Sequence, residues 1–255
     1  MDEQSGRLAR EDGVELAWRR LAGRSPTVVF LPGFRSDMVG GKANELAAFC
    51  AAGGQAMLRF DYSGHGASGG RFEDGTIGRW TEDALLLIDR LIEGRLVLVG
   101  SSMGGWIALL VALARTPRIA GLLGIAAAPD FTETLMWEAM TPEERAALLR
   151  EGVLHVPSEY GEPVPVTRAL IADGRSRCVL GGPIRLDCPV RLLQGQRDAD
   201  VPWETALRLA ERLAAADLQV TLVKDGDHRL SRPQDLALLR HALAALIALG
   251  GEDGA

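Results

Sequence analysis

The chain has few of the features that mark a secreted, membrane-spanning or nucleic-acid-binding protein. Its cysteines are three in number and include no C-x-x-C pair, so we expect buried, reduced thiols at Cys50, Cys178 and Cys188. No apolar stretch of the sequence reaches the length needed to span a membrane. The net charge of −6 gives no electrostatic reason to bind nucleic acid.

Lysine and targeting signals are also scarce. Of the 28 basic residues only Lys42 and Lys224 are lysines, and this bias toward arginine is typical of a GC-rich bacterial genome. The polar, acidic start of the chain has the pattern of neither a secretory signal nor a basic transit peptide. We therefore expect a cytoplasmic protein of bacterial origin. The oligomeric state stays open between a monomer and a homodimer.

Apolar strands alternate with helices of ten or more residues along the 255-residue chain. The pattern predicts strands at 27–31, 56–60, 96–99, 119–126, 190–194 and 220–223, and helices at 42–52, 77–93, 105–115, 203–216 and 233–249. Such alternation indicates an α/β fold, with a mostly parallel sheet covered by helices on both faces. A hairpin of residues 6–10 and 14–21 would add an antiparallel edge and bring the sheet to eight strands.

One long segment interrupts this alternation. Residues 130–187 contain no good core element and are too long for an ordinary loop, so we expect a small cap inserted into a core formed by residues 1–129 and 188–255. Within the segment the sequence predicts a helix that begins at Thr141-Pro142, a hairpin of residues 153–157 and 164–167 around Glu159-Tyr160-Gly161, and a short helix at 169–173.

Residues 96–106, LVLVGSSMGGW, carry the strongest chemical signal. They place a G-x-S-x-G motif between an apolar strand and a helix, which is the context of a nucleophile elbow. Gly100 and Gly104 would leave room for a strained backbone at Ser102. The Ser102 hydroxyl would then be exposed at the carboxyl end of the sheet, beside a helix N-terminus that favours negative charge. Ser101 occupies the variable position of the motif and should point elsewhere.

A serine nucleophile needs a base within hydrogen-bond reach. Among the four histidines, His228 follows the last predicted strand, in a loop at the carboxyl end of the sheet, and is the candidate base. His65 lies in a tight Gly-rich turn, His155 in the expected cap, and His241 inside the last helix, where each has an ordinary structural explanation.

The base in turn needs an acid, which should follow the preceding strand. Asp198 would hold the imidazole tautomer and stabilise the imidazolium, whereas Asp200 could cap the helix that starts near Trp203. We assign catalysis to Asp198 and keep Asp200 as the alternative. The chain order of serine, aspartate and histidine matches that of the α/β-hydrolases.

Two backbone donors are expected to stabilise the oxyanion. One is the N–H of Met103, directly after the nucleophile, and the other is the N–H of Phe34, where Gly33 allows a close approach. Candidate acyl-pocket residues are Phe34, Leu135, Trp137, Met140, Trp203 and Leu230.

These segments carry a family resemblance. GSSMGGW, LPGFRSDMVGGKA, RFDYSGHGASGG, QGQRDADVPW and DGDHR together resemble the α/β-hydrolase superfamily, over roughly residues 13–248. More narrowly, they are similar to the branch of mitochondrial acyl-protein thioesterases, or depalmitoylases, that also act on acyl glucuronides, and to its bacterial relatives. RFDYSGHGASGG, with the spacing from Met38 to Lys42-Ala43, is the more specific part of the likeness. The resemblance implies a triad of Ser102, Asp198 and His228, oxyanion donors at Phe34 and Met103, and an acyl ester or thioester of a protein or small molecule as substrate.

Two other classes of function stay open at this stage. A peptidase on the same scaffold would need an acidic group in the cap to hold a substrate amine, for which Glu133, Glu138 and Glu159 are available. A ligand-binding module with an inactive triad is disfavoured, because every required residue type is present. The scattered cysteines and histidines and the lack of a glycine-rich phosphate loop predict no metal and no organic cofactor.

Overall fold

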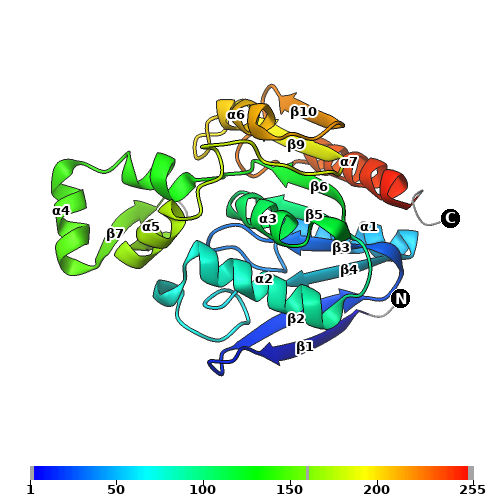
Figure 1. Ribbon diagram of the computed structural model, residues 1–255, viewed down its shortest axis with the longest axis horizontal. Coiled ribbons are helices and arrows are strands. Elements are labelled where there is room, and N and C mark those ends of the chain that lie inside the picture. The colour runs from blue at the N-terminus through cyan, green and yellow to red at the C-terminus, as the bar shows by residue number, and fades with distance from the viewer. Residues whose placement is uncertain (1–2, 159–160, 252–255) are drawn as a thin grey trace.

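A twisted sheet in the strand order β1-β2-β4-β3-β5-β6-β9-β10 forms the centre of the computed structural model (Figure 1), which describes residues 3–158 and 161–251. Its strands are β1 (Gln4–Ala9), β2 (Glu15–Leu21), β3 (Arg24–Leu31), β4 (Gln55–Phe60), β5 (Leu96–Ser101), β6 (Ile119–Ile125), β9 (Val190–Gly195) and β10 (Leu218–Val223). The β1–β2 and β2–β4 pairs are antiparallel, and the remaining pairs are parallel. The predicted α/β fold with an antiparallel edge is therefore confirmed.

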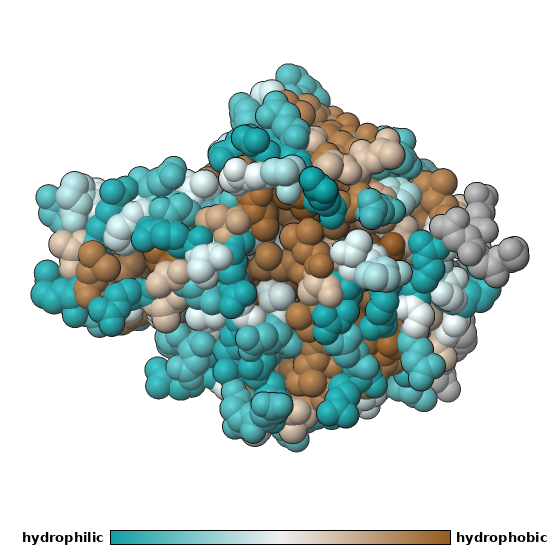
Figure 2. All heavy atoms as spheres, viewed as in Figure 1, coloured by the Kyte–Doolittle hydropathy of each residue, from teal (hydrophilic) through white to brown (hydrophobic). Residues whose placement is uncertain are grey.

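Helices cover both faces of the sheet, and each face has its own hydrophobic core. One core joins the sheet to α2 (Ile77–Leu91), α3 (Met103–Ala114) and α6 (Glu204–Arg212), and the other joins it to α1 (Gly41–Gly53) and α7 (Pro233–Gly251). Local signals set the helix ends: the Thr76 side chain accepts a hydrogen bond from the Arg79 N–H, and Gly54 takes the left-handed conformation after α1. On the face with α2 and α3, hydrophobic side chains gather over α3 between hydrophilic rims (Figure 2).

The predicted helix over 203–216 is too long. α6 ends at Arg212, because the chain then leaves the helix to pair with the segment that leads into β9. The Ile184 N–H donates to the Arg212 carbonyl, and the Ala214 N–H donates to the Ile184 carbonyl. This pairing joins residues almost thirty positions apart, and the local sequence carries no signal for it. A prediction from helical periodicity therefore places the end of the helix too late.

The segment between β6 and β9 forms a lobe beyond the carboxyl ends of the parallel strands (Figure 1). It consists of a π-helical turn η3 (Thr132–Trp137), α4 (Pro142–Glu151), the antiparallel pair β7 (Val153–Ser158) and β8 (Gly161–Thr167), and α5 (Arg168–Arg175). The predicted capping box at the start of α4 is present, since Thr141 and Glu144 exchange side-chain to backbone hydrogen bonds. The predicted turn residues Glu159 and Tyr160 lie outside the described residues.

The lobe has a small core of its own, and hydrogen bonds hold its two ends together. Met140, Leu148, Val166 and Ile171 are buried together within it. The Asp130 carboxylate, near the start of the lobe, accepts hydrogen bonds from the backbone N–H groups of residues 179 and 180 near its end, at 2.8 and 2.9 Å. Across residues 3–158 and 161–251, no helix combines the length and the apolar character needed to cross a membrane.

Candidate active site

Ser102 lies in the sharp turn between β5 and α3, with a backbone φ of 54° and ψ of −120°. A positive φ is strained for a residue with a side chain, and tight packing holds it. A Cβ on Gly100 would overlap the carbonyl oxygen of Gly104, and a Cβ on Gly104 would overlap the carbonyl oxygen of Leu31. The two motif glycines are therefore required by space, and the turn has the geometry expected of a nucleophile elbow.

Three distant side chains meet at this turn. The His228 Nε2 lies 3.1 Å from the Ser102 Oγ, and the His228 Nδ1 lies 2.8 Å from the Asp198 Oδ2. The His228 side chain is 21% exposed and the Asp198 side chain is fully buried. Because Nδ1 faces a carboxylate, it carries the proton, which leaves the Nε2 lone pair directed at the serine hydroxyl.

The Asp198 carboxylate is held from several sides. The backbone N–H groups of Asp200 and Val201 donate to its Oδ1 at 2.9 and 2.8 Å, and the Gln194 Nε2 donates to its Oδ2 at 2.9 Å. Burial by itself raises the pKa of Asp198, but the hydrogen bonds from His228 and from the two backbone N–H groups bring it below its ordinary value. Asp198 therefore stays ionised beside the imidazole.

Asp198 and Asp200, the two candidate acids, differ in how they contact the site. Asp200 contributes its backbone N–H to the Asp198 carboxylate, and Asp198 itself contacts the imidazole. Asp198, Asp200 and His228 also form a group of potential metal ligands in the described part of the chain, with ligand atoms within 4.8 Å of one another. Since Asp198 and His228 already hydrogen-bond to each other, this group gives no separate support for a metal site.

The loop after β3 passes close to the nucleophile turn. A Cβ on Gly33 would lie 3.3 Å from the Ser101 carbonyl oxygen and 3.4 Å from the Ser102 Cβ, so a glycine allows the close approach. Met103, the first residue of α3, follows Ser102 on the other side. Within the described residues, neither the Phe34 N–H nor the Met103 N–H donates to a protein acceptor. Both amides therefore belong to segments that adjoin the Ser102 turn and are without a protein acceptor in the described part of the chain.

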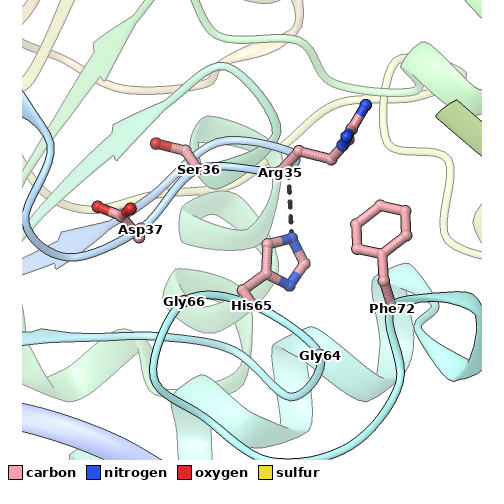
Figure 3. Close-up of a pocket in the computed structure, with 7 residues that line it drawn as sticks. All are labelled: Arg35, Ser36, Asp37, Gly64, His65, Gly66 and Phe72. Carbon is pink, nitrogen blue, oxygen red and sulfur yellow. Dashed lines mark hydrogen bonds between the residues drawn. The ribbon is translucent and has the colours of Figure 1, made fainter. Parts of the chain in front are cut away.

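A small cavity of about 200 Å³ adjoins the same loop (Figure 3). It is lined by Arg35, Ser36, Asp37, Gly64, His65, Gly66 and Phe72. His65 stands at its centre, where its Nε2 accepts a hydrogen bond from the Arg35 N–H at 3.2 Å and its Nδ1 lies 3.2 Å from the Ser63 carbonyl oxygen. The turn that contains His65 follows β4, so two loops from neighbouring strands meet here.

Burial lowers the pKa of His65 to about 4, against an opposing effect of its hydrogen bond to the Ser63 carbonyl. A histidine in the unfolded chain has a pKa near 6.5. As the pH falls from 6.5 toward 4, the unfolded chain binds a proton at this position that folded His65 does not bind, so the free energy of unfolding decreases over this range. We expect the wild-type free energy of unfolding to fall by about 3 kcal/mol more between pH 7 and pH 4 than that of His65→Phe. Denaturant titrations at four pH values measure this difference, and parallel pH curves for the two proteins would contradict it.

The predicted acyl-pocket residues are spread over four regions. The Phe34 ring lies 5.0, 5.7 and 5.8 Å from the rings of Phe72, Phe131 and Trp80, and Leu135 packs against the same core. Trp203, directly before α6, is half-buried. The other three predicted residues are placed elsewhere.

Met140, Trp137 and Leu230 pack in hydrophobic cores. Met140 is buried inside the lobe, and Trp137 packs against the same cluster with the guanidinium groups of Arg145 and Arg175 over its ring. Leu230 is 3% exposed in the core formed with α1 and α7. Apolar character did not distinguish core from pocket at these positions, because both environments favour the same residue types.

Among the described residues, His228 is the histidine that hydrogen-bonds to Ser102. Several residues that support the site were not predicted from the sequence. His155 on β7 and His241 on α7 are exposed. Gln194, fully buried at the end of β9, orients Asp198, and Lys42 at the start of α1 donates a hydrogen bond to the Arg229 carbonyl, next to His228. The polar side chain of Gln194 near the carboxyl end of a strand, four residues before Asp198, is the available signal.

An elbow serine, a paired histidine and aspartate, and two free amides on a doubly wound parallel sheet define a hydrolase of the α/β class. The chain belongs to the alpha/beta hydrolase family, whose model matches residues 28–238. This confirms the resemblance seen in the motifs.

Individual relatives extend over nearly the whole chain. "Palmitoyl-protein thioesterase ABHD10, mitochondrial" of Bos taurus is 40% identical over 242 residues, which are 94% of this chain and 79% of that protein. The structure of the mouse protein, "Alpha/beta hydrolase domain-containing protein 10", is 37% identical with a TM-score of 0.89, covering 96% of this chain and 98% of that one. A crystal structure from Agrobacterium vitis S4 is 45% identical with a TM-score of 0.93, covering 97% and 100%.

Proposed function

We propose that this chain is a serine hydrolase that cleaves carboxylic esters or thioesters through an acyl-enzyme. The observation that carries the proposal is the continuous hydrogen-bonded line from Ser102 through His228 to Asp198, at 3.1 and 2.8 Å. The Ser102 Oγ attacks the acyl carbon while the His228 Nε2 accepts its proton, and Asp198 stabilises the imidazolium. The Phe34 and Met103 N–H groups hold the oxyanion of the tetrahedral intermediate.

The same groups complete acylation and then carry out deacylation. His228 donates its proton to the leaving thiol or alcohol as the carbon–sulfur or carbon–oxygen bond breaks, which leaves the acyl group on Ser102. Water then attacks the acyl carbon, His228 accepts a proton from it, and collapse of the second intermediate returns the proton to the Ser102 Oγ. The free acid and the starting enzyme result, so no cofactor is needed.

The relatives' names favour an acyl thioester as the physiological substrate. The bovine relative is a palmitoyl-protein thioesterase by name, and we propose that this chain acts on acyl thioesters of a protein or a small molecule. Residues 130–187, whose lobe lies beyond the carboxyl ends of the strands, would act as a cap on the site. A cytoplasmic location and a bacterial origin stay predictions from composition, since the named relative is mitochondrial.

The peptidase alternative has less support. Glu133, one of the acidic residues that could hold a substrate amine, is paired with the Arg175 guanidinium at 2.8 and 3.1 Å. Glu138 is exposed, and Glu159 lies outside the described residues. Within the described residues, none of these carboxylates is both unpaired and buried near Ser102, as recognition of a substrate ammonium would require.

We expect turnover of p-nitrophenyl esters and of acyl-CoA or acyl-cysteine thioesters, tested as a panel of graded chain length beside aminoacyl p-nitroanilides. The proposed oxyanion amides and the triad act on any activated acyl carbonyl, whereas the described residues offer no unpaired, buried carboxylate to bind the ammonium group of an aminoacyl anilide. Ester or thioester kcat/KM should therefore exceed that for the anilides by at least about 10²-fold. Cleavage of aminoacyl anilides without cleavage of acyl esters would instead establish the peptidase.

A further inference from the structure

The turn that follows β4, residues 61–68, contacts the loop that carries the Phe34 N–H, and no step of the hydrolytic cycle uses it. We propose that His65 is a positioning residue, which fixes the oxyanion loop by accepting a hydrogen bond from the Arg35 backbone. This inference rests on the proposed function, because it assigns a role in holding one of the two oxyanion donors.

The His65 ring has one orientation available to it. His65 is 4% exposed, and the rings of Phe72, Trp80 and Tyr62 meet its ring edge-on with centroids at 5.1, 5.1 and 5.7 Å. The Nδ1 faces the Ser63 carbonyl, which can only accept, so Nδ1 carries the hydrogen. The Nε2 is therefore left with a lone pair, which is directed at the Arg35 N–H at 3.2 Å.

The Ser63 end of this arrangement is anchored in the core. The Ser63 N–H and hydroxyl both donate to the buried Asp83 Oδ2, at 2.8 and 2.7 Å. The Trp80 indole N–H donates to the Ser63 carbonyl at 3.1 Å, sharing that oxygen with His65. Because Asp83 and Trp80 belong to α2, the helix fixes Ser63, Ser63 fixes the imidazole, and the imidazole fixes Arg35.

Arg35 needs such a support. Its φ of 58° is a left-handed conformation that residues with a side chain adopt only where the surroundings hold them. The Ser36 N–H donates to the Gly33 carbonyl at 3.0 Å, so Phe34 and Arg35 are the central residues of a tight turn. Relaxing Arg35 to a negative φ would turn the peptide next to Phe34 and redirect the loop that carries the proposed oxyanion donor. The bond from His65 opposes this change.

A second residue of the same turn holds the next part of the loop. The Asp61 Oδ1 accepts a hydrogen bond from the Met38 N–H at 2.6 Å, and its Oδ2 accepts one from the Ala67 N–H at 2.8 Å. The Asp61 carboxylate is thus shared between the turn and the loop, three residues beyond Arg35. The segment RFDYSGHGASGG and the Met38 spacing therefore form one structural unit, whose aspartate and histidine hold adjacent parts of the oxyanion loop.

The test compares His65→Phe with His65→Gln. Phenylalanine keeps a ring in the aromatic surroundings but removes the acceptor, whereas the glutamine amide oxygen can accept from the Arg35 N–H. We expect His65→Phe to lower kcat by about 10- to 100-fold with KM within about threefold, and His65→Gln to recover much of the loss. His241→Phe, an exposed substitution on α7, is the matched control and should leave kcat unchanged.

A second readout separates positioning from packing. An alkyl trifluoromethyl ketone forms a tetrahedral oxyanion on the serine, whereas a non-hydrolysable acyl thioether binds without one. Ketone affinity should fall in His65→Phe in proportion to kcat/KM, and thioether affinity should stay within about threefold. A kcat in His65→Phe within twofold of wild type, or a loss of thioether affinity equal to that of the ketone, would overturn the inference.

Failure of the proposed function gives a different result. A wild-type protein that neither turns over acyl substrates nor reacts with a fluorophosphonate would contradict the serine-hydrolase activity itself. An active, labelled wild type beside an equally active and folded His65→Phe would contradict only the role of His65. Circular dichroism melting of each variant, run at the assay temperature, identifies any loss of activity that comes from unfolding.

Discussion

Replacing Ser102 by alanine should lower the turnover of every ester and thioester substrate by at least about 10³-fold, with the fold retained. The substitution removes the Oγ that lies 3.1 Å from the His228 Nε2 and leaves the surrounding backbone unchanged. Residual turnover would come from the oxyanion amides and from binding alone, since these groups do not depend on the serine hydroxyl. Steady-state assays on the best ester and thioester of the panel measure the effect.

Ser101→Ala is the matched control, because it removes the hydroxyl of the neighbouring residue on β5. That variant should keep activity within about threefold of wild type, since Ser101 occupies the variable position of the motif. The double variant Ser102→Ala with His228→Ala should be no slower than Ser102→Ala alone, because the two residues act as one unit. Near wild-type turnover in Ser102→Ala, or an equal loss in Ser101→Ala, would remove Ser102 from the mechanism.

Asp198→Asn should lower kcat by about 10³- to 10⁴-fold, as expected for an amide in place of the orienting carboxylate of a triad. The carboxylate accepts the His228 Nδ1–H at 2.8 Å, and it also accepts from Val201 N–H, Asp200 N–H and the Gln194 amide. An asparagine that turns its amide toward His228 favours the tautomer with the proton on Nε2, which then cannot accept the Ser102 proton. The expected loss is therefore in kcat, with KM little changed.

Asp200→Asn provides the comparison, because the two aspartates lie two residues apart in the same loop. Asp200 supports Asp198 through its backbone N–H, which the substitution keeps, so activity should stay within about fivefold of wild type. The proton NMR signal of the His228 Nδ1–H provides a second measurement. The signal should be lost in Asp198→Asn, where the proton moves to Nε2, and stay in place in Asp200→Asn. A larger loss of activity in Asp200→Asn would transfer the acid role to that residue.

The sequence predicts the sheet and most of the helices, because the signals for these elements are local. Apolar runs of strand length alternate with amphipathic helices, and glycine, proline and capping residues mark many of the ends. The prediction fails at α6, where residue 213 leaves the helix to pair with Ile184. The π-helical turn at Thr132–Trp137 is also missed, because its hydrogen-bond pattern leaves no distinct period in so short a segment.

The proximity of the three candidate triad residues can also be predicted from the sequence, for a topological reason. The carboxyl ends of parallel strands share one edge of a sheet, so residues that directly follow β5, β9 and β10 must lie close to one another. Side-chain packing follows no such rule. Apolar character suggests pocket positions for Leu230 and Met140, and the structure places both side chains in hydrophobic clusters. His65 gave the signal of a turn residue only, since its partner Arg35 lies thirty positions earlier in another loop.

Peptide mapping of the wild-type protein after reaction with a fluorophosphonate tests the central claim most directly. Intact-mass measurement should show a single added phosphonyl group, and tandem mass spectrometry should place it on Ser102. Preincubation with a slowly hydrolysed acyl ester should protect that residue, because the acyl-enzyme occupies the same oxygen. An adduct on Ser101, or an unmodified protein that still hydrolyses the ester, would contradict a mechanism that begins at the Ser102 hydroxyl.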